Sequence, residues 1–161
     1  MLGCDAAARY EEPQILILAA QQDKGSLVLL LLEDGADVDG TSDGQTALSA
    51  AVQCGNVGMV ELLWDRGANV DRADGFGETA VFAAVRQSHA ALLATLIARG
   101  ADVNHASLAR LRPLLLAVEA GDLRLVRLLV RAGAVPKTAA EEDFVLDDSV
   151  RFDMQQRAPR R

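Results

Sequence analysis

The chain has 161 residues, a length typical of one domain, and half of them are hydrophobic, which is enough to bury a core. Its formal net charge of −7 argues against non-specific binding to nucleic acid, so we expect no nucleic-acid partner. The longest apolar run, residues 27–32, is far shorter than the roughly 20 residues that span a bilayer, so no membrane association is expected either.

The charge is distributed unevenly along the chain. Residues 1–80 contain 14 acidic and 4 basic residues, a net charge of −10, whereas residues 81–161 contain 9 acidic and 12 basic residues, a net charge of +3. An acidic surface attracts basic segments and speeds their encounter. The sequence therefore favours a partner protein that carries a basic segment.

The cysteine content predicts the compartment. Cys4 and Cys54 are the two cysteines, and no basic region precedes an apolar stretch at the N-terminus, so no signal peptide is expected. Two thiols without a secretion signal indicate a reducing environment and no disulfide framework. We therefore expect a cytoplasmic or nuclear location, or both.

A four-residue pattern recurs along the chain at a nearly constant step. Gly-Ala-Asp-Val or a close variant occupies residues 35–38, 67–70, 100–103 and 133–136, so the steps are 32, 33 and 33 residues. Periods of this length are typical of solenoids, whose units bury their apolar faces only against their neighbours. Behind an N-terminal segment, 1–12, the period predicts the units 13–40, 41–73, 74–106 and 107–137.

Each unit is predicted to hold two short helices and a loop. In the second unit the helices cover residues 46–54 and 57–66, separated by Gly55 and ended by Gly67. Glycine just after the last helical residue accepts the left-handed conformation that ends a helix. Residues 71–77 then form a polar turn that leads into the third unit.

The end of the chain is predicted to differ from the units before it. A capping box at residues 138–141 predicts a last helix over 138–146, which would close the stack. Residues 147–161 are polar and Arg-rich, and we expect a mobile tail. The tail is interpreted either as a basic docking or nuclear-import segment or as a solvated terminus.

These features resemble the ankyrin-repeat family. Residues 74–81, Asp-Gly-Phe-Gly-Glu-Thr-Ala-Val, match the opening of its repeat, and residues 99–104, Arg-Gly-Ala-Asp-Val-Asn, match its close. Residues 126–133 match its second helix. The resemblance covers about residues 13–137. It implies an all-α solenoid of stacked helix-turn-helix units with short turns, and a concave groove that binds partner proteins.

The resemblance also implies which residues contact a partner. The family's contact positions lie at the turn tips and on the first helix of each unit, and Asp74 adds an acidic residue at a turn tip. Carried over to this chain, the candidate protein-binding residues are Asp43, Gln45, Gln53, Asp74, Gly75, Phe76, Glu78, Arg86, Gln87 and Glu119.

The chain departs from the family pattern at three places. The family's histidine in the first helix is replaced by Ile17, Ser49, Phe82 and Leu115, which removes a structural hydrogen bond and no catalytic group. The turn at residues 106–112 lacks the usual Asp and Gly, and Arg110 stands where the glycine is expected. We interpret this turn as plain drift, as a distorted turn or as a binding feature.

The third departure is Leu29, which replaces the solvent-suited residues of the later units, Glu61, Ala94 and Arg127. One interpretation is that residues 1–12 fold over Leu29. The other is that Leu29 belongs to a partner surface, because exposed apolar patches mark contact sites.

The sequence offers no constellation for chemistry. His89, which is expected to begin a helix, and His105 have no short spacing to the cysteines, so no metal site is expected. The acids Asp37, Asp71 and Asp102 recur with the period, which explains them better than paired-carboxylate catalysis does. We therefore expect no enzymatic activity and no cofactor.

The predicted function is protein–protein interaction. We expect a monomeric adaptor or inhibitor that binds a partner through the concave groove. The alternative is a substrate-recognition subunit of a larger complex such as a ubiquitin ligase, although no SOCS-box or F-box segment is evident. Because one fold hosts many functions, the fold does not name the partner.

Overall fold

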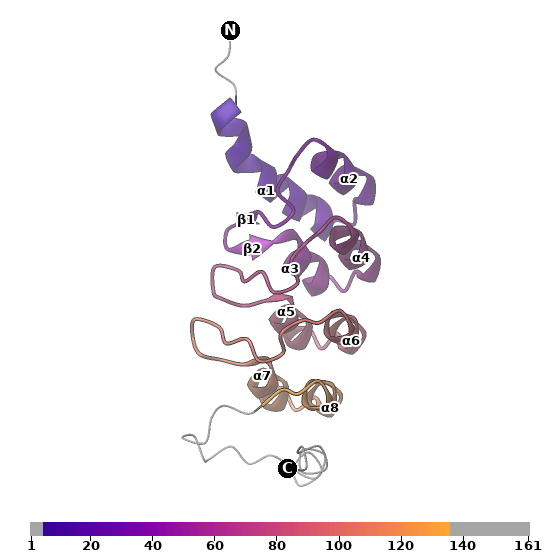
Figure 1. Ribbon diagram of the computed structural model, residues 1–161, viewed down its shortest axis with the longest axis vertical. Helices are drawn as coiled ribbons and strands as arrows, with labels where there is room; N and C mark the ends of the chain where they lie inside the picture. Colours follow the sequence, from indigo (N-terminus) through magenta and orange to yellow (C-terminus); the bar gives the residue numbers. More distant parts are fainter. Residues whose placement is uncertain (1–4, 136–161) are drawn as a thin grey trace.

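Stacked helix pairs make up most of the described structure. The computed structural model describes residues 5–135, and these form a column in which each pair lies on the next along one long axis (Figure 1). In chain order the elements are α1 (Asp5–Gln21), α2 (Gly25–Glu33), β1 (Thr41–Ser42), β2 (Gln45–Thr46), α3 (Ala47–Gln53), α4 (Val57–Asp65), α5 (Ala80–Arg86), α6 (Ala90–Ala98), α7 (Pro113–Glu119) and α8 (Leu123–Arg131).

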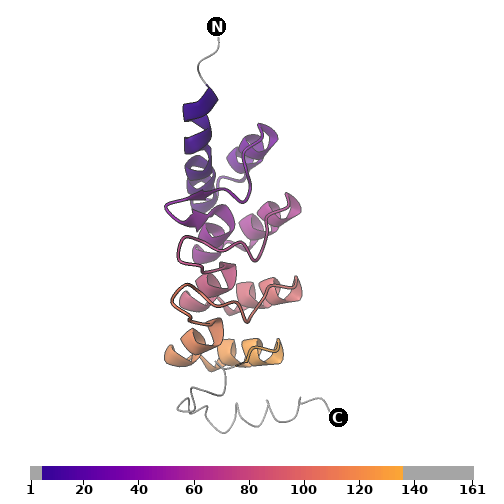
Figure 2. The same cartoon turned by 60° about the vertical axis from the view of Figure 1, so that its left-hand side comes forward.

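The helices form two layers. The inner helices α1, α3, α5 and α7 stack on one another, and the outer helices α2, α4, α6 and α8 form a second row beside them (Figures 1 and 2). The loops that join one pair to the next project beside the inner row. The predicted all-α solenoid is therefore confirmed.

Small side chains let the two layers approach closely. Ala51, Ala84 and Ala117 occupy the same register on three successive inner helices, and each is fully buried. Large side chains come from the outer row, where Leu63 and Leu129 are also fully buried. Pairs this short bury their apolar faces only because a neighbouring pair covers them, so the stability of the stack is shared along its length.

A glycine ends each outer helix, as Gly67 shows for α4. Gly67 has φ +88° and donates its N–H to the carbonyl of Trp64 at 2.8 Å, while Ala68 donates to Leu63 at 3.1 Å. These two bonds satisfy carbonyls that the last turn of a helix leaves unpaired. The same conformation recurs one period away at Gly100, as the repeat predicted.

Successive units are joined by a repeated hydrogen bond. The carboxylate of Asp39 accepts the N–H of Asn69 at 2.8 Å, and the carboxylate of Asp71 accepts the N–H of Asp102 at 2.8 Å. In the next unit the side-chain oxygen of Asn104 accepts the N–H of Val135 at 2.9 Å. Of the recurring acids of the sequence, Asp71 is therefore an inter-unit acceptor, whereas Asp37 and Asp102 accept N–H groups two residues further along their own turns.

The loop before α3 contains a strand pair that the sequence analysis missed. Thr41 pairs with Thr46 and Ser42 with Gln45, in antiparallel register. The two residues between the strands, Asp43 and Gly44, both have positive φ, at 51° and 74°. This is the turn that suits the right-handed twist of a two-residue hairpin, and it adds a small strand pair to the otherwise helical stack.

The irregular turn before α7 keeps the geometry of the regular one. Arg110 takes φ +59°, as Gly77 does one period earlier at +72°. Ser107 replaces the usual aspartate and accepts the N–H of Leu111 through its hydroxyl at 3.3 Å. The turn is therefore not distorted, although a non-glycine residue at positive φ is uncommon.

The N-terminal helix crosses a predicted boundary. α1 begins at Asp5 and includes Pro13, so the border expected between the segment 1–12 and the first unit falls inside a helix. On α2, Leu29 is half-buried, and the exposed leucines are Leu27 and Leu30. The predicted capping helix, 138–146, and the Arg-rich tail, 147–161, lie outside the described residues.

No helix within residues 5–135 is both long and apolar enough to cross a membrane.

Candidate functional site

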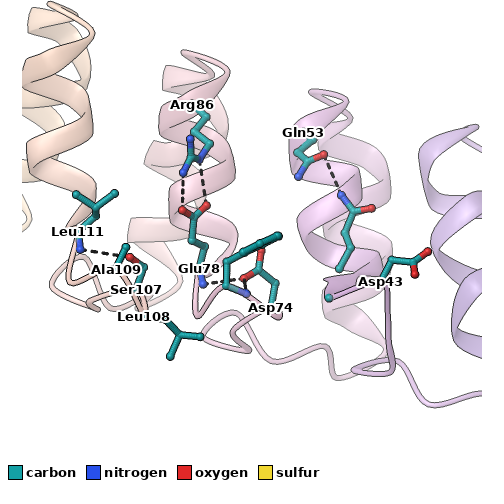
Figure 3. Close-up of a pocket in the computed structure, with 12 residues that line it drawn as sticks. Asp43, Gln53, Asp74, Glu78, Arg86, Ser107, Leu108, Ala109 and Leu111 are labelled. Carbon is teal, nitrogen blue, oxygen red and sulfur yellow. Dashed lines mark hydrogen bonds and ion pairs between the residues drawn. The ribbon is translucent and has the colours of Figure 1, made fainter.

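A groove runs along the concave side of the second, third and fourth units. It has a volume of about 660 Å³ and lies between the loop tips and the inner helices (Figure 3). Its lining is formed by Asp43, Gly44, Gln45, Gln53, Asp74, Phe76, Glu78, Arg86, Ser107, Leu108, Ala109 and Leu111.

Paired polar side chains form the wall of the groove. In the second unit Gln45 donates its side-chain N–H to Gln53 at 2.9 Å, and in the third unit Arg86 donates its Nε–H to Glu78 at 3.0 Å (Figure 3). The two pairs have the same register. Gln45 and Glu78 each precede the threonine at the start of an inner helix, and Gln53 and Arg86 are the last residues of those helices. The wall therefore changes from neutral to ionic between these units.

The Glu78–Arg86 pair is held at two points. Arg86 donates from both Nε and a terminal nitrogen to the two carboxylate oxygens of Glu78. The hydrogen bond to Glu78 raises the pKa of Arg86 above its ordinary value. Because Arg86 is about half exposed and Glu78 is mostly covered, the guanidinium is the side of the pair that faces solvent.

Asp74 organises its own loop. One carboxylate oxygen accepts the N–H of Phe76 and the N–H of Glu78, both at 2.8 Å. This local bonding is the mechanism by which aspartate favours turns. The negative charge of Asp74 is therefore partly compensated by hydrogen bonds within the loop. Asp43, by contrast, is exposed at its hairpin.

Two apolar side chains project from neighbouring loop tips. Phe76 is 70% exposed and Leu108 is 78% exposed, the two largest exposed fractions among the large hydrophobic residues of the described chain. Leu108 donates its N–H to the carbonyl of Phe76 at 3.0 Å, so the two tips lie side by side. We call these two residues the apolar tips.

The structure brings most of the predicted contact residues together. Seven of the ten line the groove: Asp43, Gln45, Gln53, Asp74, Phe76, Glu78 and Arg86. Gly75, Gln87 and Glu119 do not line it.

The three predicted contact residues that do not line the groove lie at other places in the structure. Gly75 donates its N–H to Gly44 at 2.7 Å, and a Cβ on Gly75 would lie 2.9 Å from the Cα of Gly44, so its role is close backbone packing. Gln87 is exposed just after α5, and Glu119 is exposed at the end of α7. Glu119 has the register of Arg86, but its counterpart in the loop is Leu111, so the polar pair is not repeated.

The fourth unit also contributes to the groove, which the sequence did not predict. Ser107, Leu108, Ala109 and Leu111 all line it, and all belong to the irregular turn. Their register one period after Asp74 and Phe76 was available from the sequence. The missing Asp and Gly hid that register, because the turn did not match the family pattern.

The site has no arrangement suited to metal chemistry. Within the described residues, no three His, Cys, Asp or Glu side chains are placed to hold a metal ion. His89 begins α6, as predicted, and its ring lies 3.3 Å from the carbonyl of Gln53. His105 lies 3.0 Å from the carbonyl of Gly77, so His89 contacts the backbone of the preceding unit and His105 contacts the backbone of its own unit.

Comparison with known proteins identifies the class. Residues 1–74 match the family model for ankyrin repeats (3 copies). Stacked helix pairs with the same glycine-ended outer helix continue to residue 135, which extends the pattern beyond the matched segment. The predicted resemblance to the ankyrin-repeat family is therefore confirmed over residues 1–74. Repeats of this family generally mediate protein–protein interaction and are generally non-catalytic.

Curated relatives match over a shorter stretch. The potassium channel AKT1 of Oryza sativa subsp. indica is 41% identical over 61 residues, which is 37% of this chain and 6% of the channel. The same values hold for potassium channel AKT1 of Oryza sativa subsp. japonica. The chain therefore spans only a small part of these ankyrin-bearing channels.

Proposed function

We propose that the concave groove binds an extended segment of a partner protein, so that the chain acts as an adaptor or inhibitor. One observation carries the proposal: the apolar tips, Phe76 and Leu108, stand exposed and adjacent at the rim of a polar groove. Exposed aromatic and apolar side chains beside a concavity are typical anchors of protein interfaces.

The groove suggests the chemistry of the partner segment. An apolar side chain of the partner packs between the apolar tips, and its backbone or polar groups bond to the Gln45–Gln53 wall. A basic residue fits beside Asp43, which is exposed at the start of the groove. Asp74 and Glu78 contribute less free charge than the sequence suggested, because both already accept hydrogen bonds within the third unit.

Affinity purification with matched variants tests this proposal. The wild type, the double variant Phe76→Ala with Leu108→Ala, and Leu123→Ala are each immobilised and their bound proteins identified by mass spectrometry. Leu123 is a suitable control because it is also exposed but lies on α8, outside the groove lining. A partner held by the wild type and the control, lost by the double variant and then shown to bind directly as purified protein, supports the groove.

The opposite pattern rejects the proposal. If the double variant stays folded and the purified partner binds it with unchanged affinity, the contact surface lies elsewhere. Fluorescence imaging of the tagged chain at the same time tests the expected cytoplasmic or nuclear location. Subunits of a ubiquitin ligase among the specific partners would favour the alternative role of substrate recognition.

A further inference from the structure

A second, smaller cavity lies beside the groove, between α1 and the β1–β2 hairpin. It has a volume of about 170 Å³, and we call it the α1 cavity. The hairpin contributes Ser42, Asp43 and Gln45 to its lining. Asp43 and Gln45 also line the groove, so the two hollows adjoin on the concave side of the stack.

One face of α1 forms the other wall of the α1 cavity. The lining residues of this helix are Gln14, Ile17, Leu18 and Gln21, whose spacing places them on the same side of a helix. Leu18 is 50% exposed, although it has the register of Ala50 and Ala83, which are buried. An accessible apolar side chain therefore lies in this wall.

The α1 cavity also offers hydrogen-bond acceptors and one negative charge. Gln21 donates its side-chain N–H to the side-chain oxygen of Gln45 at 3.1 Å, which leaves the side-chain oxygen of Gln21 as an acceptor. Asp43 is exposed, and within the described residues no hydrogen bond or ion pair engages its carboxylate. Figure 3 shows this carboxylate pointing away from Asp74 and Glu78. Among the described lining residues Asp43 is the one that carries a charge, so the cavity attracts cations.

This combination suits a basic side chain. Lysine and arginine lay an aliphatic stem along apolar surface while their charged head stays in a polar environment. In the α1 cavity the stem lies against Leu18, and the head pairs with Asp43 and the side-chain oxygen of Gln21. An acidic side chain would face the like charge of Asp43, and an apolar one would cover that carboxylate without pairing it. Since a cavity of about 150 Å³ holds one benzene molecule, the α1 cavity has room for one side chain.

We propose that the α1 cavity binds a basic side chain of the partner segment that occupies the groove. The inference rests on the proposed function, because it assigns one residue of that segment. Neighbouring helices pack about 8–10 Å apart, so the two unit steps from α1 to the loop of Phe76 span about 16–20 Å. An extended segment covers this distance with about five or six residues. The partner therefore carries its basic residue about that far along the chain from the apolar residue that packs between the apolar tips.

A displayed library of random peptides, long enough to reach from the α1 cavity to the apolar tips, supplies the probe. Peptides are selected on the immobilised full chain, and the tightest one is synthesised and used in every later measurement. It is expected to carry a lysine or arginine at the stated separation from an apolar residue. Its binding to the double variant Phe76→Ala with Leu108→Ala tests the proposed function separately.

Charge-matched variants test the role of Asp43. Asp43→Asn is expected to raise the dissociation constant of the peptide about fivefold, because it removes one partner of a partly exposed ion pair. Asparagine tolerates the positive φ of this position, so the hairpin is retained. Glu61→Gln removes the same charge from an exposed position on α4 and is expected to leave the dissociation constant unchanged.

Leucine variants test the apolar wall in the same way. Leu18→Ser is expected to raise the dissociation constant about threefold, because the stem of the basic side chain loses its apolar contact. Leu123→Ser, at a similarly exposed leucine on α8, is the control and is expected to have no effect. Circular dichroism melting verifies that each variant is folded.

A double-mutant cycle distinguishes direct contact from a general effect of charge. The basic residue of the peptide is replaced by glutamine, and both peptides are measured against the wild type and Asp43→Asn. The loss caused by Asp43→Asn should nearly disappear with the glutamine peptide, because substitutions of residues in contact are not additive.

Several results overturn the inference. Peptides that depend on the apolar tips but carry no basic residue at this separation reject the α1 cavity and leave the proposed function standing. Equal effects of Asp43→Asn and Glu61→Gln, or additive effects in the cycle, have the same meaning. If no peptide is selected, or if the double variant Phe76→Ala with Leu108→Ala binds the peptide as the wild type does, the proposed function fails and this inference fails with it.

Discussion

Arg86 and Glu78 face each other across the wall of the groove, eight residues apart in the sequence. Two nitrogens of Arg86 donate to the two carboxylate oxygens of Glu78, and the Nε contact is 3.0 Å. The pair is partly exposed, so we expect it to contribute at most about 1 kcal/mol to the free energy of unfolding. Its larger effect is on the electrostatic character of the groove.

Glu78→Gln is expected to slow the association of a basic partner segment and to weaken the salt dependence of that rate. The substitution removes a negative charge and leaves Arg86 without its ionic partner, and rim charges act mainly on encounter. Stopped-flow or surface-based kinetics with the purified partner measure the effect at several salt concentrations. Glu119→Gln is the control, since Glu119 is outside the groove lining. Equal rates for both variants and the wild type would contradict this assignment.

Phe76→Ala is expected to act on the dissociation rate instead. Phe76 is an apolar tip, and truncating a well-packed aromatic anchor typically costs about 2 kcal/mol or more in binding. The association rate should change little, because the substitution alters no charge. If Phe76 only packs on its own loop, the dissociation rate of the partner stays at the wild-type value while the loop becomes less stable.

The repeat made most of the fold predictable. Gly67 and the alanines of the inner helices recur at a constant step, so helix ends and close packing followed from local rules that hold in each unit. The hairpin around Asp43 and Gly44 was missed because its two strands contain only two residues each. The groove residues of the second and third units were also accessible from register.

The features that were not predicted from the sequence depend on contacts between residues that are distant in the sequence. Leu108 is an apolar tip only because its loop lies beside that of Phe76. Leu27 and Leu30 are exposed because no helix pair precedes α2 in the described chain, whereas the pattern alone singled out Leu29. From the sequence, Asp74 and Glu78 are expected to carry free negative charges. The geometry of the loop shows that both accept hydrogen bonds within the third unit.

Thr46 and Thr79 begin equivalent helices but bond differently, which predicts opposite effects of the same substitution. Thr46 accepts the N–H of Ser49 at 3.1 Å, and Ser49 accepts the N–H of Thr46 at 3.1 Å. In the third unit Phe82 replaces Ser49, and the buried hydroxyl of Thr79 has no hydrogen-bond partner. Thr46→Val is expected to cost about 1 kcal/mol.

Thr79→Val is expected to be neutral or to stabilise the chain by up to about 1 kcal/mol, because it replaces an unsatisfied buried hydroxyl with a methyl group of similar size. Urea unfolding followed by circular dichroism compares the two variants. Equal destabilisation by both substitutions would show that Thr79 forms a cap in solution.

Asp71 is expected to stabilise the junction between the second and third units. Its carboxylate accepts the N–H of Asp102, and Asn104 has the equivalent role in the following unit. Asp71→Ala should therefore cost about 1 kcal/mol, whereas Asp71→Asn, which keeps an acceptor oxygen, should cost less. Hydrogen exchange of the Asp102 amide gives a local readout, with faster exchange in Asp71→Ala. Unchanged protection of that amide would refute the role.

Gly67→Val tests the origin of the helix ends. Gly67 has φ +88°, and no atom of any residue other than Gly67 and its two chain neighbours lies within 4 Å of a Cβ built on it. Steric crowding is therefore absent, and the cost of a side chain comes from the backbone conformation alone. A β-branched residue strongly disfavours positive φ, so we expect a loss of about 1–3 kcal/mol in the free energy of unfolding.

Two companion variants separate backbone strain from other effects of the substitution. Gly67→Asn should lose less stability than Gly67→Val, because asparagine tolerates positive φ better than a β-branched residue does. Gly58 lies inside α4 with only Asn56 near a built Cβ, at 3.7 Å, so Gly58→Ala should raise stability by up to about 1 kcal/mol. Chemical unfolding gives all three values. If Gly67→Val unfolds at the wild-type midpoint, the chain ends α4 without the left-handed conformation, and the recurring glycine has another cause.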